Sequence, residues 1–167
     1  MVLVAPGLYL GDKQAGADHE RLQRAGVSAV CAVGAKTGTA PGVVYHHVPV
    51  KDDGVSSMLP FLDSACAFVH EQRQWGAVLV HCKGGINRSP CLVVAYLMKF
   101  EQLTLHEALE LCSLARPAAR CPANFRSDLE TLARECERRT AESLELSSQC
   151  TECTDLPSQP SHQGAPM

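Results

Sequence analysis

Two kinds of hydrophobic pattern alternate along the chain. Short apolar runs rich in β-branched residues have the length of buried strands rather than of helices. The predicted strands are residues 8–11, 27–33, 43–50 and 77–80. Longer segments between them carry apolar residues every three or four positions, which predicts helices with one buried face.

Capping and breaking residues set the ends of the expected helices. The first predicted helix is short, capped by Asp18 and ended by Gly26, and the second covers residues 58–74 with Pro60 in its first turn. A third covers residues 91–98. The fourth begins with a capping box at residues 104–107 and ends at residues 115–117, and the last begins at Pro122. The side chains expected to face the core are Leu59, Leu62, Ala65, Cys66, Val69, Leu109, Cys112, Leu114, Phe125, Leu129, Leu132 and Cys136.

Strands that alternate with helices predict an α/β fold, with a mostly parallel central sheet flanked by helices on both faces. After about Thr140 the apolar period ends, and Ser, Thr, Gln, Pro and Glu dominate. We therefore expect one domain over residues 1–140 and a disordered tail over residues 141–167.

Composition narrows the class of protein. Of 167 residues, 46% are apolar and 20% are charged, as in ordinary globular domains, and the net charge of −3 disfavours a general nucleic-acid binder. No apolar stretch is long enough to span a membrane, and the N-terminal run lacks the basic start of a signal peptide. Nine cysteines at irregular positions indicate reduced thiols. We expect a cytoplasmic protein, with the nucleus as a second compartment and no stable membrane anchor.

The candidate chemistry lies in residues 80–90, between the strand at 77–80 and the helix at 91–98. A strand that turns through glycines into a helix N-terminus directs several backbone N–H groups at one point, where a dianion can bind. The same field favours a thiolate at Cys82, with a pKa in the range of roughly 3.5 to 7.5. Arg88 can hold two oxygens of a phosphate with its planar guanidinium.

The run His81-Cys82-(five residues)-Arg88-Ser89 resembles the signature of the cysteine-dependent protein tyrosine phosphatases, and its surroundings are similar to those of the small, atypical dual-specificity branch. The preceding His, the loop glycines, the following Ser and the strand and helix on either side make this pattern specific. The resemblance implies hydrolysis of phosphotyrosine and phosphoserine/threonine monoesters on proteins through a cysteinyl-phosphate intermediate, with no metal and no other cofactor.

The resemblance also implies roles for individual residues. Cys82 attacks phosphorus, Arg88 stabilises the transferring group, Ser89 donates a hydrogen bond to the departing thiolate, and His81 tunes the thiolate and the loop. The loop residues expected to bind phosphate, together with Arg88, are Lys83, Gly84, Gly85, Ile86 and Asn87.

A general acid is needed to protonate the leaving alkoxide. The family places an Asp about 30 residues before the nucleophile, and Asp52 lies 30 residues before Cys82. Asp53 is the competing candidate. The helix that follows these residues is similar to the family's helix at this place, and aligning the two favours Asp52. An ordinary acidic turn without a catalytic role would also explain both residues.

Two features depart from the family's usual pattern. The run before the last helix reads Pro122-Ala123-Asn124-Phe125 and lacks the glycine of Pro-Asn-x-Gly-Phe. Lys83 follows the nucleophile directly, as in lipid phosphatases of the wider superfamily.

The expected partners are phosphorylated proteins and not nucleic acids. The alternatives are a phosphoinositide or other non-protein phosphatase on the same fold, and a catalytically weak phosphate-binding adaptor.

Overall fold

A computed structural model of the chain describes residues 1–35 and 38–150, with side-chain positions up to residue 146. Its strands are β1 Val2–Ala5, β2 Leu8–Gly11, β3 Val27–Val33, β4 Val44–Val48 and β5 Ala77–His81. Its helices are α1 Lys13–Ala17, α2 His19–Arg24, α3 Leu59–Arg73, α4 Arg88–Phe100, α5 Leu105–Ala115 and α6 Ala123–Cys150. Every one of these helices is too short or too polar to cross a lipid bilayer.

The strands form one sheet in the order β1-β2-β5-β3-β4, and only β1 and β2 pair antiparallel. Strand β5 lies at the centre, between β2 and β3, and four of its five residues are buried. Burial on both faces explains why its sequence is continuously apolar rather than alternating. Ligands of such sheets bind at the carboxyl ends of the parallel strands, and β5 ends directly before Cys82.

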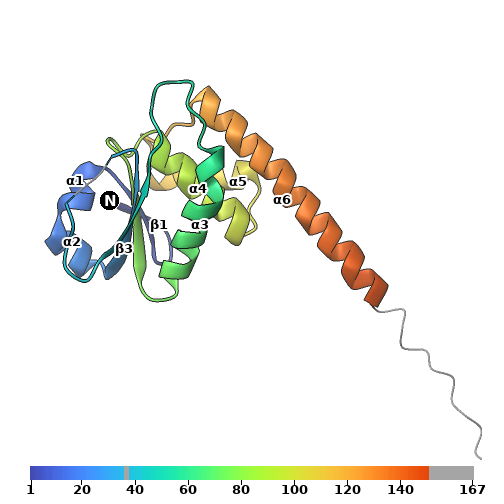
Figure 1. Cartoon of the computed structure of the whole chain (residues 1–167), viewed down its shortest axis with the longest axis horizontal. Helices are drawn as coiled ribbons and strands as arrows, with labels where there is room; N and C mark the ends of the chain where they lie inside the picture. Colours follow the sequence, from blue (N-terminus) through green and yellow to red (C-terminus); the bar gives the residue numbers. More distant parts are fainter. Residues whose placement is uncertain (36–37, 151–167) are drawn as a thin grey trace, which may run out of the picture. The chain divides into compact units, whose positions relative to one another are not determined.

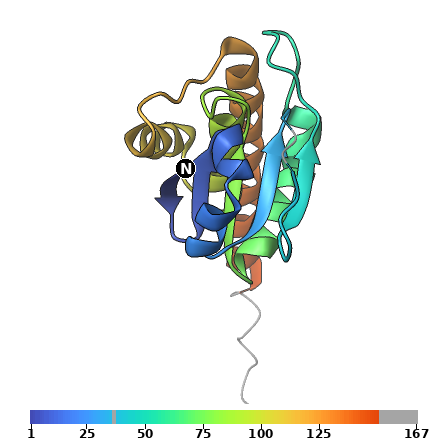
Figure 2. The same cartoon turned by 90° about the vertical axis from the view of Figure 1, so that its left-hand side faces the viewer.

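Helices cover both faces of the sheet (Figures 1 and 2). On one face, α1 and α2 pack over a small core. The buried members of that core are Ala15, Leu22, Val27, Val30 and Leu79. On the other face, α3, α4, α5 and the start of α6 enclose the main core, in which α4 is buried along almost its whole length.

The sequence predicted most of these elements, and the α/β class with a mostly parallel sheet is confirmed. Strand β1 and helix α1 were not predicted. Two side chains expected in the core are not there, because Leu59 is 37% exposed and Leu114 is 74% exposed. Leu59 is the first residue of α3, and Leu114 is the last but one of α5.

The last helix continues beyond the expected domain end at Thr140. Residues 141–150 are helical, so the expectation of disorder is wrong for them, while residues 151–167 lie outside the described residues. Strong helix formers and an ion pair between Arg138 and Glu142, four residues apart, favour the extension, although the side chains of residues 141–146 are exposed. By its contacts the chain divides into a compact unit, Met1–Cys136, and a second unit, Glu137–Met167.

Candidate active site

The loop of residues 82–87 connects the end of β5 to the start of α4, which begins at Arg88. Gly85 has a φ of 65°, and a Cβ atom there would lie 2.6 Å from the carbonyl oxygen of Gly11. Only glycine fits this combination of left-handed backbone and close approach. The turn lets the loop curl back over Cys82, so that backbone N–H groups face the sulfur.

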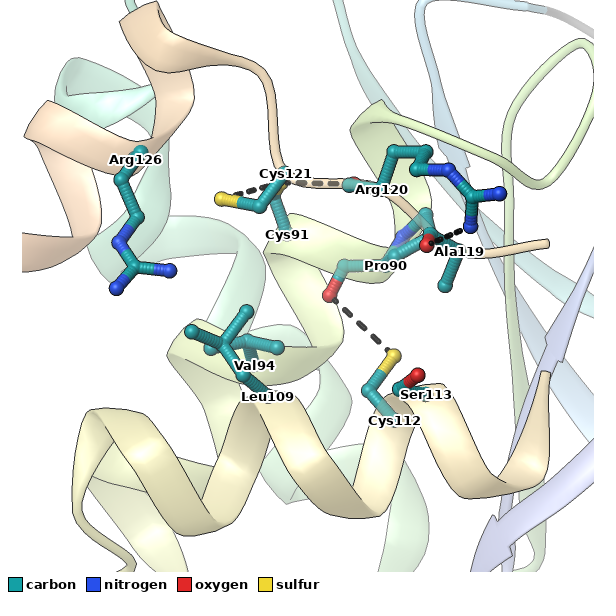
Figure 3. Close-up of a pocket in the computed structure, with 10 residues that line it drawn as sticks. All are labelled: Pro90, Cys91, Val94, Leu109, Cys112, Ser113, Ala119, Arg120, Cys121 and Arg126. Carbon is teal, nitrogen blue, oxygen red and sulfur yellow. Dashed lines mark hydrogen bonds between the residues drawn. The ribbon is translucent and has the colours of Figure 1, made fainter. Parts of the chain in front are cut away.

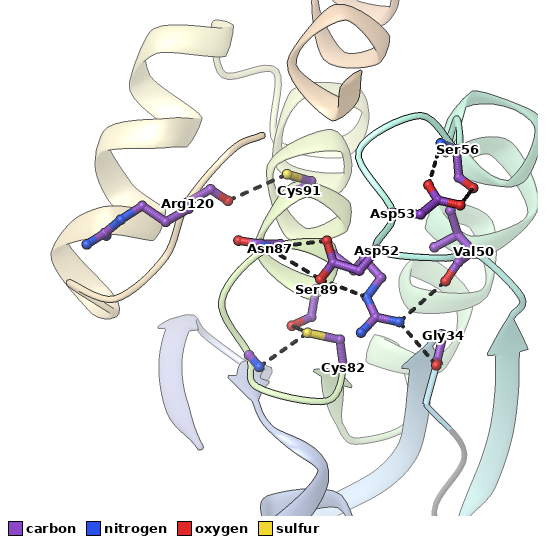
Figure 4. Close-up of polar contacts among 12 residues, drawn as sticks. Gly34, Val50, Asp52, Asp53, Ser56, Cys82, Asn87, Ser89, Cys91 and Arg120 are labelled. Atoms are coloured by element: carbon purple, nitrogen blue, oxygen red, sulfur yellow. Dashed lines mark hydrogen bonds and ion pairs between the residues drawn. The ribbon is translucent and has the colours of Figure 1, made fainter. Parts of the chain in front are cut away.

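Cys82 lies at the bottom of this loop, 2% exposed. Its Sγ atom accepts hydrogen bonds from the N–H of Gly85 and from the hydroxyl of Ser89, both at 3.2 Å (Figure 4). Burial by itself raises the pKa of the thiol, but the hydrogen bonds from Ser89 and from the loop amides outweigh it, so that the pKa is lowered overall. The site therefore favours the nucleophilic thiolate form.

Arg88 is fixed by the ends of two other strands. Its Nη1 atom donates to the carbonyl oxygens of Gly34, at 3.1 Å, and Val50, at 3.4 Å. A Cβ atom at Gly34 would lie 2.1 Å from that nitrogen, so the position requires glycine. With Nη1 anchored, the Nε edge of the guanidinium is directed to the site, where Nε lies 3.4 Å from a carboxylate oxygen of Asp52.

Asp52 and Asp53 have different surroundings although they are adjacent. Asn87 donates from Nδ2 to both carboxylate oxygens of Asp52, at 3.2 and 3.3 Å, which draws that side chain over the loop. Asp53 instead accepts three hydrogen bonds from Val55 and Ser56. These bonds lower the pKa of Asp53 to about 2, so it is an ionised turn residue directed away from Cys82 (Figure 4).

His81 is fully buried directly before the nucleophile. Its Nδ1 atom lies 3.2 Å from the carbonyl oxygen of Cys82. Burial lowers the pKa of this imidazole, more than the hydrogen bond to Cys82 raises it. A neutral, buried ring in this place orients the start of the loop.

Arg116, at the end of α5, braces the loop from outside, and the sequence did not indicate this role. Its Nε and Nη2 atoms donate to the carbonyl oxygens of Gly85, at 2.6 Å, and Gly84, at 3.0 Å. Its Nη2 atom also pairs with Asp12, at 3.6 Å. Binding the loop carbonyls on the outside holds the N–H groups inward. An arginine directly before the proline that ends a helix was the signal available in the sequence.

The turn before α6 and the first residues of this helix contact two parts of the site. The N–H of Arg120 donates to the carbonyl oxygen of Ile86 at 2.7 Å and so supports the loop around Cys82. Asn124 donates from Nδ2 to the carbonyl oxygen of Ser56 at 2.7 Å, which ties down the segment that follows Asp52. The turn and the start of α6 thus support both segments without the glycine that related domains carry.

The structure brings together most of the residues that the sequence singled out. Their polar contacts form two groups around the loop, Cys82 with Ser89, and Asp52 with Asn87 and Arg88. The side chains of Lys83 and Ile86 are exposed, so these two residues contribute only their backbone to the loop. Within the described parts of the chain, no three His, Cys, Asp or Glu side chains are placed to hold a metal ion.

Comparisons with known proteins agree with this geometry. The catalytic domain of the dual specificity phosphatases matches residues 8–135. The chain belongs to the dual specificity phosphatase family. It is therefore a cysteine-dependent protein phosphatase, as the sequence predicted.

Two relatives illustrate the range of the family. Human dual specificity phosphatase 28 is 39% identical over 133 residues, which are 78% of this chain and 76% of that protein. Mouse dual specificity protein phosphatase 12 is 36% identical over 135 residues, 77% of this chain but only 40% of that longer protein. The crystal structure of human DUSP28 superposes with a TM-score of 0.80 at 36% identity, covering 83% of this chain and 99% of that one.

Proposed function

We propose that this phosphatase hydrolyses phosphotyrosine and phosphoserine/threonine monoesters on proteins through a phosphocysteine at Cys82. The observation that carries the proposal is a buried thiol with a lowered pKa, held by Ser89 and the loop amides opposite an anchored Arg88. Asp52, which contacts Asn87 and Arg88, is the proposed acid.

In the first step, the Cys82 thiolate attacks phosphorus and the bond from phosphorus to the ester oxygen breaks. The phosphoryl oxygens receive hydrogen bonds from the loop N–H groups and from the Nε edge of Arg88, which faces Asp52 in the resting site. These bonds stabilise the charge that develops. Asp52, held over the loop by Asn87, gives its proton to the departing oxygen. The products of this step are the alcohol and a cysteinyl phosphate.

In the second step, a water molecule attacks phosphorus on the side from which the alcohol has left. Asp52, now a carboxylate, takes the proton of this water, and the bond from sulfur to phosphorus breaks. The Ser89 hydroxyl, 3.2 Å from Sγ in the resting site, donates to the thiolate as it is released. Inorganic phosphate departs and the starting thiolate is restored.

A reducing compartment such as the cytoplasm suits this chemistry, because the reactive form of Cys82 is also the form that oxidants attack. The seven cysteines up to residue 146, where side-chain positions are described, are not joined in disulfides. Exposed Lys83 beside the nucleophile adds positive charge, which would also serve more anionic substrates such as phosphoinositides. Protein and lipid substrates therefore have to be compared directly.

The test is a comparison of kcat/KM on matched phosphotyrosyl, phosphoseryl and phosphothreonyl peptides and on phosphoinositides in detergent micelles. We expect turnover of all three peptides, and activity that metal chelators leave unchanged. Turnover of the lipids alone would replace the proposal with the lipid-phosphatase alternative. Binding of phosphopeptides without turnover would make the chain a phosphate-binding adaptor.

A further inference from the structure

A pocket of about 190 Å³ lies behind the phosphate loop, between the start of α4, α5 and the turn before α6 (Figure 3). Its walls carry three thiols, those of Cys91, Cys112 and Cys121, and a cation, Arg126. None of these thiols takes part in the proposed reaction at Cys82.

Two of the thiols touch each other. The Sγ atoms of Cys91 and Cys121 are 3.6 Å apart, against about 2.0 Å in a disulfide. Cys91 is on the first turn of α4 and is buried, while Cys121 is on the turn before α6 and is partly exposed at the pocket. A small movement of that turn would bring the sulfurs to bonding distance.

The surroundings make the two sulfurs unequal. The Cys91 thiol donates to the Cys121 sulfur, which lowers the pKa of Cys121, and nearby Arg126 acts in the same direction. The same contact and burial raise the pKa of Cys91. Burial raises the pKa of Cys112 to about 12, so this third thiol is unreactive. Cys121 is also the partly exposed member of the pair, so it is the thiol that a peroxide reaches, and buried Cys91 is the partner 3.6 Å away.

We propose that Cys91 and Cys121 form an oxidisable dithiol, a modification site separate from the catalytic Cys82 that hydroperoxides convert to a disulfide. The Cys121 thiolate attacks a peroxide oxygen, the oxygen–oxygen bond breaks, and a sulfenic acid forms while hydrogen peroxide is reduced to water. The Cys91 sulfur then attacks the Cys121 sulfur and displaces the hydroxyl, which leaves as a second water. Two thiols and one peroxide thus give one disulfide and two waters, and a thiol reductant reverses the change.

The disulfide would join the start of α4, which follows the phosphate loop, to the turn before α6, which supports that loop. Cys91 follows Ser89 by two residues, and Cys121 follows Arg120, whose N–H holds the carbonyl of Ile86 at 2.7 Å. A bond between residues 30 positions apart would also restrict the unfolded chain. The oxidised protein should therefore melt at a higher temperature than the reduced one.

The test uses the full chain with the Cys82→Ser substitution, which removes the catalytic thiol from the reaction. After treatment with dilute hydrogen peroxide, trypsin should release a linked pair of peptides, 89–99 and 121–126, each with a single cysteine. The linked pair should have lost two hydrogens, the melting temperature should rise, and dithiothreitol should reverse both changes. The wild-type chain should give the same linked pair.

Two matched variants complete the test. Cys121→Ser should abolish the linked pair, and Cys112→Ser, from the same pocket, should retain it. Irreversible oxidation of Cys121 without a crosslink would overturn the proposal. So would a disulfide that joins Cys91 to Cys82, or Cys121 to any cysteine other than Cys91.

Discussion

Asp52 and Asp53 are adjacent carboxylates with different surroundings. Asp52 contacts Asn87 and Arg88 at the phosphate loop, whereas Asp53 is occupied by the turn that Val55 and Ser56 form. Asp52→Asn should lower kcat on phosphopeptides on the order of 10²- to 10⁴-fold, the usual contribution of a positioned acid. The loss should shrink on aryl phosphates with more acidic phenols, because those leaving groups need less protonation.

Asp53→Asn is the matched control for this prediction. It removes a carboxylate of the same size from the neighbouring position, and its effect on kcat should be small and independent of the leaving group. Steady-state rates on a series of aryl phosphates compare the two variants. A loss that depends on the leaving group in Asp53→Asn would exchange the roles of the two residues.

His81 should make the stability of the protein depend on pH. Its pKa in the folded protein lies below the ordinary 6.5, so between the two values the unfolded chain binds the proton more strongly. The stability that comes from the neutral ring is fully present above pH 6.5 and is lost as the pH falls through the folded pKa. In urea unfolding at pH 7.5 and 5.5, His81→Asn should lose less stability on acidification than the wild type does.

Exposed His19 supplies the control for this measurement. His19→Asn should leave the difference between the two pH values as it is in the wild type. If His81→Asn and the wild type lose equal stability on acidification, the buried imidazole is not the group that titrates.

At the scale of elements, the phosphate loop depends on the end of α5. Arg116 donates charged hydrogen bonds to the carbonyls of Gly84 and Gly85, and such bonds contribute about 1.5 to 3 kcal/mol each. Without them the loop amides are less well directed, so Arg116→Ala should lower kcat/KM on the order of 10- to 100-fold. Thermal unfolding should be measured alongside the kinetics to exclude loss of the fold.

The opposite end of the same helix provides the comparison. Thr104 and Glu107 form a capping box there, far along α5 from Arg116. Thr104→Ala should cost about 1 kcal/mol of stability with little effect on kcat/KM. Equal kinetic losses in the two variants would mean that α5 supports the site only through its general stability.

The elements that the sequence predicted well are those with a strong local signal. The capping box at Thr104 and the cap at Asp18 occur as predicted, and so does the strand over residues 27–33. Strand β1 was missed because its four residues have little periodicity and are held by pairing with β2. Arg116 was missed because its partners are 31 and 32 residues away in the chain.

The residues of the phosphate loop could be predicted from the sequence, but the residues that contact this loop from other segments could not. The spacing from Cys82 to Arg88 indicated the nucleophile and the cation, because one loop holds both residues. The preference for Asp52 over Asp53 comes from the resemblance, and the contacts of Asn87 with Asp52 support it. Contacts between separate loops leave no period in a sequence.

At the scale of the whole molecule, the unit Met1–Cys136 holds every residue of the site. Beyond Thr140 the described side chains of α6 are exposed, so little burial energy depends on them. A chain ending at Thr140 should keep its kcat on a small aryl phosphate, and its melting temperature should change by less than about 2 °C. A fall of many degrees would show that residues 141–167 pack on the domain.

The central claim is that phosphate passes through the sulfur of Cys82. The direct measurement is a millisecond quench of the wild-type enzyme with a phosphotyrosyl peptide, followed by mass spectrometry of tryptic peptide 74–83, in which Cys82 is the single cysteine. We predict a transient addition of one phosphoryl group to the Cys82 sulfur, which forms as tyrosine is released and decays as inorganic phosphate appears. A phosphoryl group on another residue, or full turnover by Cys82→Ser, would contradict the account.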